Sequence, residues 1–149
     1  MPRPRTSPFG RVCALDLGAA RVGVAISDEL GLFAHPRGVL EGRDKRALVA
    51  ALADLAREEG LSRFVVGLPL DMKGGEGQAA RGAREVAQRI ADATGCEVEL
   101  WDERLTTVQA GRALADSGLR GKKAKARIDE AAAVAILQSW LESRRDGER

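Results

Sequence analysis

An aspartate inside the first apolar run of the chain is the feature that most constrains its fold. Residues 12–18 read VCALDLG, a composition that predicts a buried strand with Asp16 near its end. A buried carboxylate that lacks a partner is strongly destabilising, because the ionised group loses its hydration. The fold must therefore bring a cation or a set of hydrogen-bond donors to Asp16.

Two more acids occupy similar settings far along the sequence. Glu103, next to Asp102, follows the strand-like segment 97–101, and Asp129 opens an apolar helix predicted for residues 128–144. Each acid alone is equally typical of an ordinary strand end or helix cap. Three separated carboxylates at the ends of regular elements together favour a metal site that folding assembles.

Length and composition indicate one globular domain. The 149 residues are 44% hydrophobic and 31% charged, which is enough apolar material to bury a core. We predict a single domain over residues 1–149, with flexible ends at 1–10 and 144–149. No apolar run is long enough to cross a membrane and no signal peptide is visible, so we expect a cytoplasmic protein without a membrane partner.

Ligands for zinc are scarce in this sequence. Cys13 and Cys96 show no CxxC or CxxH spacing, and each falls in or beside a predicted strand, where a free cysteine packs as a small apolar residue. His35 is the only histidine, and we expect it at the surface or in packing. A zinc site is therefore disfavoured.

The apolar pattern divides the chain into strands and helices. The predicted strands are residues 11–17, 21–28, about 32–39, 63–68 and 97–102. The predicted helices are residues 43–59, a segment with an apolar stripe from Ala83 to Ala91, residues 106–117 and residues 128–144. This order predicts an α/β fold with a central five-stranded mixed sheet, three antiparallel strands followed by two parallel ones, flanked by helices.

The predicted topology lets the three acids converge. Asp16 would lie on the central strand, and Glu103 would end a nearby parallel strand. Asp129, expected on the first turn of the last helix, shares a face with Ala133 and Ile136 by its spacing, and that face must pack on the sheet. Sites in such sheets gather at strand ends near a switch in topology.

Four motifs in order carry a resemblance to a known family. They are ALDLG at 14–18 with RVGVA at 21–25, VGLPL at 66–70, DERLTT at 102–107 and IDEAAA at 128–133. With these motifs the chain resembles the YqgF/RuvX family from about Arg11 to Leu141. The resemblance implies an RNase H-like fold, related to RuvC-type Holliday junction resolvases. It also implies a nuclease that matures the 5′ end of pre-16S rRNA.

The resemblance implies that Asp16, Glu103 and Asp129 are the catalytic residues and metal ligands. Glu103 is preferred to its neighbour because the resolvases end the corresponding strand with a glutamate, and Asp102 stays the alternative. The sequence departs from RuvC-type resolvases in one respect. They place a fourth acid shortly after the last one, where this chain has Ala132.

Hard carboxylate oxygens suit Mg²⁺ or Mn²⁺, and two ions about 4 Å apart would hold the attacking water and the leaving 3′ oxygen. The segment 120–127 holds five positive residues and no acid, in a chain of net charge +2. Such a run is usually a solvated loop, but beside a carboxylate site it suits a polyanion. The residues predicted to contact phosphates of a structured RNA or branched DNA are Arg21, Lys122, Lys123, Lys125 and Arg127.

Other functions stay open at this point. A RuvC-like Holliday junction or DNA-repair endonuclease and a non-catalytic nucleic-acid-binding protein both fit the same residues. A sugar- or acetate-kinase-like phosphotransferase would explain Asp-x-Gly before a second strand. It is disfavoured because those enzymes enclose ATP between two such domains and because no GxxxxGK[ST] motif occurs. RNA or DNA as substrate, endo- or exonucleolytic cleavage, and a monomer or a homodimer are equally open.

Overall fold

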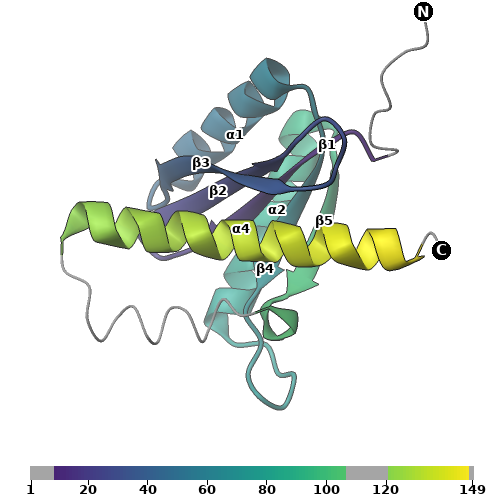
Figure 1. Cartoon of the computed structure of the whole chain (residues 1–149). Coiled ribbons are helices and arrows are strands. Elements are labelled where there is room, and N and C mark those ends of the chain that lie inside the picture. Colours follow the sequence, from purple (N-terminus) through teal and green to yellow (C-terminus); the bar gives the residue numbers. More distant parts are fainter. Residues whose placement is uncertain (1–8, 107–120, 148–149) are drawn as a thin grey trace, which may run out of the picture.

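The computed structural model describes residues 9–106 and 121–147, and a five-stranded sheet forms its centre (Figure 1). The strands are β1 (Arg11–Leu17), β2 (Arg21–Ser27), β3 (Ala34–Glu41), β4 (Leu61–Leu68) and β5 (Glu97–Asp102). They lie in the order β3-β2-β1-β4-β5. The first three form an antiparallel meander, and β4 and β5 run parallel to β1. The mixed sheet with a central first strand is thereby confirmed.

Helices cover both faces of this sheet. They are α1 (Lys45–Glu59), α2 (Gln78–Thr94), the short 3₁₀ turn η1 (Glu103–Leu105) and α4 (Lys122–Gly147). α1 and α2 lie on one face, and α4 crosses the other (Figure 1). Alternation along β1 divides the core accordingly, because Cys13 and Leu15 pack beneath α1 and α2 whereas Val12 and Ala14 pack beneath α4.

The ends of α1 and α2 follow from local sequence. The carboxylate of Asp44 accepts a hydrogen bond from the backbone N–H of Ala47 at 3.1 Å, which caps the start of α1. Gly60 and Gly95 end the two helices with φ of 63° and 71°, a conformation that glycine adopts without a steric penalty. The helix predicted for residues 43–59 is therefore close to α1, and the predicted stripe from Ala83 to Ala91 lies inside α2.

The start of the last helix was predicted wrongly. α4 begins at Lys122 rather than at residue 128, so the expected basic loop is for the most part the beginning of a helix. Asp129 consequently lies inside α4 and not on its first turn. Lysine, alanine and arginine are strong helix formers, and they extend the helix beyond the part whose apolar residues pack on the sheet. α4 also continues into the segment 144–149 that we expected to fray.

Some predictions fall outside the described residues. The helix predicted for residues 106–117 does so beyond its first residue, and the side chains of Lys122 and Lys123 do so as well. None of the described helices has the length and apolar character needed to span a membrane.

Both cysteines are free thiols, and burial raises the pKa of the Cys13 thiol.

Polar contacts fix α4 on the sheet at two places. Near its start, the carboxylate of Glu130 accepts a hydrogen bond from the backbone N–H of Gly38 on β3 at 3.1 Å. Further along, the buried indole of Trp140 donates to Glu99 on β5 at 2.7 Å, and Arg144 pairs with the same carboxylate at 2.6 Å. These contacts hold the helix across the sheet from β3 at one edge to β5 at the other, and so set the position of its acids.

Candidate active site

Asp16 lies near the end of the central strand, on the face that α4 covers. Side chains alternate along β1, so Asp16 points to the same side as Val12 and Ala14. Its side chain is only 2% exposed. Gly23 on β2 is its direct partner in the sheet. The structure therefore places this acid in the centre of the fold and away from bulk water.

Glu103 is the second buried acid and follows directly after β5. It is 2% exposed, and burial raises the pKa of its carboxyl from 4.5 to about 7, with a smaller contribution from the charge of Asp102. Its carboxylate lies over Gly67 on β4, where an added Cβ would stand 2.6 Å from Oε1. Burial thus favours the protonated form of this acid.

Asp102 has a different environment from its neighbour. Its carboxylate accepts hydrogen bonds from the side chain of Arg104, at 2.7 Å to Nη2, and from the backbone N–H of the same residue at 2.9 Å. These bonds lower the pKa of Asp102 and cap η1. Arg104 also donates to the carbonyl of Asp71 at 3.5 Å, so the glycine-containing loop after β4 lies beside η1. Asp102 is thus engaged in a local structural role, which supports Glu103 as the acid of the site.

Asp129 reaches the sheet from α4 and is paired with an arginine. The guanidinium Nε of Arg21, the first residue of β2, donates to Asp129 Oδ2 at 2.7 Å. The side chain of Asp129 is 17% exposed and that of Arg21 is 42% exposed. Sequence reasoning placed this arginine near the acids as a phosphate contact but gave no sign of the ion pair.

The three acids share one side and one end of the sheet. Asp16 and Asp129 both adjoin Gly23, and Glu103 lies over Gly67 on the neighbouring strand β4. Across residues 9–106 and 121–147, however, no three His, Cys, Asp or Glu side chains stand close enough to hold a metal ion. The three acids thus lie in one region of the fold, but their side chains are not close enough together to coordinate one metal ion.

Two glycines shape the site, and the sequence analysis did not single them out. A Cβ on Gly23 would stand 1.9 Å from the carbonyl oxygen of Asp129, and a Cβ on Gly67 would meet both Glu103 and Ile136 at less than 3 Å. Both positions are strand interiors, where glycine often marks the close approach of another segment. That signal was available in the sequence without any knowledge of the fold.

The basic residues near the site lie at the start of α4. Lys125 and Arg127 are exposed, and Lys125 precedes Asp129 by one helical turn, which puts both on one face. Lys125 therefore lies on the same side of α4 as Asp129, whereas Arg127, two residues before that acid, points away from it. Both side chains are accessible to solvent, and their contact with phosphates stays a prediction.

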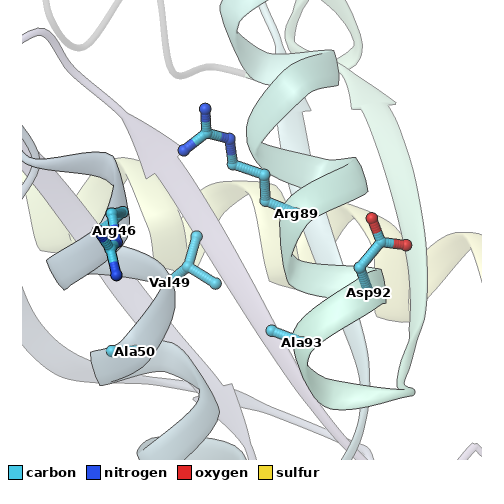
Figure 2. A pocket seen from close by; sticks show the side chains of 6 residues that line it. All are labelled: Arg46, Val49, Ala50, Arg89, Asp92 and Ala93. Carbon is cyan, nitrogen blue, oxygen red and sulfur yellow. The ribbon is translucent and has the colours of Figure 1, made fainter.

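A hollow of about 510 Å³ lies elsewhere, between α1 and α2 (Figure 2). Its lining residues are Arg46, Val49 and Ala50 of α1 and Arg89, Asp92 and Ala93 of α2. These helices cover the face of the sheet opposite α4. The hollow is therefore separate from the three acids.

Comparison with known proteins gives consistent results. The family model for RuvX, described as Holliday junction resolvase, matches residues 10–143. A relative from Anaeromyxobacter sp. (strain Fw109-5) is 44% identical over 134 residues, which cover 90% of this chain and 98% of that protein. One from Myxococcus xanthus (strain DK1622) is 43% identical over 135 residues, which cover 91% and 89%. Both carry the name "Putative pre-16S rRNA nuclease".

Solved structures show the same fold. The structure of T. thermophilus RuvC in complex with Holliday junction substrate superimposes with a TM-score of 0.62 at 16% identity, over 92% of this chain and 96% of that one. A second Thermus thermophilus RuvC structure gives 0.56 over 91% and 96%. The predicted RNase H-like architecture is therefore confirmed.

Proposed function

Because this chain belongs to the RuvX family, we propose that it is a metal-dependent nuclease that hydrolyses phosphodiester bonds of nucleic acid and processes the 5′ end of pre-16S rRNA. The observation that carries the proposal is the pair of buried acids, Asp16 and Glu103, at one end of the sheet with Asp129 opposite them on α4. The name that both relatives of this chain carry, "Putative pre-16S rRNA nuclease", supports the rRNA substrate. Such a substrate agrees with the cytoplasmic location expected from the sequence.

The donor set suits divalent cations. Carboxylate oxygens are the ligands that Mg²⁺ and Mn²⁺ prefer, and the three residues that would supply them are Asp16, Glu103 and Asp129. When bound, two such ions would supply an activated water and stabilise the leaving oxygen. Packing fixes the first two side chains before any ligand arrives, which lowers the cost of organising the site.

Other residues of the chain would bind the substrate. Lys125 and Arg127 are exposed on the α4 side and would contact backbone phosphates, which gives affinity but no sequence preference. Arg21 stands next to the acids and would contact a phosphate close to the reacting bond. Lys122 and Lys123 belong to the same basic segment of the sequence.

A cleavage assay with a matched pair of variants tests this proposal. The substrates are a labelled pre-16S rRNA fragment with a 5′ extension, single strands and a four-way DNA junction, each with Mg²⁺, Mn²⁺ or EDTA. We expect cleavage of the RNA with metal only. Asp16→Asn should abolish it and leave the fold intact, since the change removes charge repulsion among the acids. Asp54→Asn, an exposed acid of α1, is the control and should cleave normally.

Two outcomes would redirect the proposal. Paired nicks in the junction with intact RNA would favour the second candidate, a junction resolvase, which the description of the family model names. Binding of nucleic acid without cleavage under any condition would favour a non-catalytic binding protein.

A further inference from the structure

The ion pair between Arg21 and Asp129 occupies a carboxylate that the proposed metal site needs. The distance from Nε to Oδ2 is 2.7 Å, within the range of a charge-assisted hydrogen bond. The described acids do not close into a group that could hold a metal ion. The guanidinium takes up one lone pair of Oδ2 and places a positive charge beside the carboxylate, so the ion pair and a metal ion at this carboxylate disfavour each other.

The backbone around this pair is fixed on both sides. Gly23, two residues after Arg21, lies against the carbonyl of Asp129 so closely that no side chain fits between β2 and α4. The next residue of the helix, Glu130, accepts a hydrogen bond from the backbone N–H of Gly38 on β3. An exchange of partners at Asp129 therefore requires rotation of side chains only, without a shift of the helix.

The two partners differ in how freely they can move. The side chain of Asp129 is only 17% exposed, so the neighbouring atoms leave its carboxylate little room to move. The side chain of Arg21 is 42% exposed and can turn outward to solvent while its backbone stays in β2. A guanidinium released in this way is well suited to phosphate, because its planar donors match the oxygens of a phosphodiester.

We propose that Arg21 competes with a divalent cation for the Asp129 carboxylate and, once displaced, binds a phosphate of the nucleic acid. The inference rests on the proposed function and adds an order of events, in which metal binding frees the arginine for the substrate. The cation and the substrate then favour each other's binding, since each takes one partner of the same ion pair. Metal-free protein, in contrast, holds the arginine on the acid.

The proposal predicts that one substitution, Arg21→Gln, has opposite effects on the binding of metal and of RNA. Arg21→Gln removes both the competing donor and a positive charge next to the metal site, so Mn²⁺ should bind about 3–10-fold more tightly. The same variant should bind RNA about tenfold more weakly in the presence of Ca²⁺, a cation used here to support binding. In EDTA the RNA affinity should change much less, because the arginine is then held by Asp129. A purely structural ion pair would not give this combination.

The experiment is calorimetric titration of Mn²⁺ into the wild-type chain, Arg21→Gln and Arg37→Gln, without nucleic acid. Arg37 pairs with Glu59 at 3.2 Å, is 48% exposed and lies away from the acids, so its variant should bind Mn²⁺ like the wild type. RNA binding of the same proteins is measured with Ca²⁺ and with EDTA. Thermal unfolding reports whether each variant folds, and Arg21→Lys, which keeps the charge, is the second variant.

The possible results separate the two proposals. In one outcome the wild type binds Mn²⁺ and cleaves RNA, and both Arg21 variants bind Mn²⁺ with the affinity of the wild type. This result overturns the competition but leaves the proposed function standing. Absence of Mn²⁺ binding to every protein overturns both. Tighter Mn²⁺ binding by Arg21→Gln together with a loss of RNA affinity confined to Ca²⁺ supports the competition.

Discussion

The backbone carbonyl of Asp129 lies directly on Gly23, at a point where a Cβ would come within 1.9 Å of the carbonyl oxygen. α4 therefore rests on β2 with no side chain between them. Gly23 is also the sheet partner of Asp16. The same contact thus brings the acid of the helix next to the acid of the central strand and next to Arg21.

Replacement of Gly23 by alanine should destabilise the protein. The added methyl group meets backbone atoms, which cannot rotate away, so we expect a loss of about 2–3 kcal/mol in the free energy of unfolding. Urea unfolding measures this. Gly82→Ala is the control, because a Cβ on Gly82 meets nothing within 4 Å inside α2 and alanine should stabilise that helix by about 0.5–1 kcal/mol. Equal stability of the two variants would contradict the close approach.

Replacement of Gly67 by alanine should act on the site more than on stability. A Cβ there would stand 2.6 Å from Oε1 of Glu103 and 2.8 Å from Cδ1 of Ile136, and both are side-chain ends that can move. We therefore expect the carboxylate of Glu103 to be displaced and the cleavage rate at saturating RNA to fall by about tenfold or more. The loss of stability should be smaller than for Gly23→Ala. A variant with normal kcat would show that Glu103 does not need its present position.

The fold was largely predictable because the core strands are short apolar segments and the packed helices carry apolar residues at helical spacing. The strand around Asp16 and the helix stripe through Ile136 were visible for this reason. The start of α4 was missed because Lys125 and its neighbours carry no apolar period, although they favour a helix through their intrinsic propensity.

The site was predictable as a set of acids but not as a set of pairs. Asp16 and Glu103 were identified as candidate site residues because acids in or beside apolar segments are unusual. The pair of Arg21 with Asp129 joins residues 108 positions apart, and it depends on how α4 crosses the sheet. No local pattern in the sequence reports such a contact.

Substitution of the two adjacent acids should separate their roles. Glu103→Gln should lower the rate of cleavage by several orders of magnitude, because it removes a buried carboxylate of the proposed metal site. Asp102→Asn should cost much less, since its carboxylate is occupied by Arg104 and caps η1. Single-turnover cleavage with Mg²⁺ measures both. The opposite ranking would assign the metal to Asp102.

The burial of Glu103 should make metal-free protein less stable as the pH rises. The pKa of this carboxyl is about 7 in the folded chain and 4.5 as its ordinary value, so the folded state holds an extra proton between these limits. Its stabilising contribution is complete below pH 4.5 and is lost as the pH rises through 7, by up to about 3 kcal/mol. Urea unfolding in EDTA across this range measures the change. Glu103→Gln should lack this decline, and an identical pH profile in both proteins would argue against a buried, protonated Glu103.

Removal of two positive charges from the start of α4 should weaken RNA binding without altering its sequence preference. Lys125 and Arg127 are exposed near the start of α4, the helix that carries Asp129, so the double change to glutamine should lower affinity for all sequences alike. The slope of log K against log salt should flatten by up to about 1.4–1.8, since each lost phosphate contact accounts for about 0.7–0.9. Cleavage at saturating RNA should persist, because the acids are untouched.

The matched control changes Arg46 and Arg57 on α1, on the opposite face, and should leave the slope as it is. An equal effect of the two double variants would mean that only net charge matters, and that the substrate does not run along the start of α4.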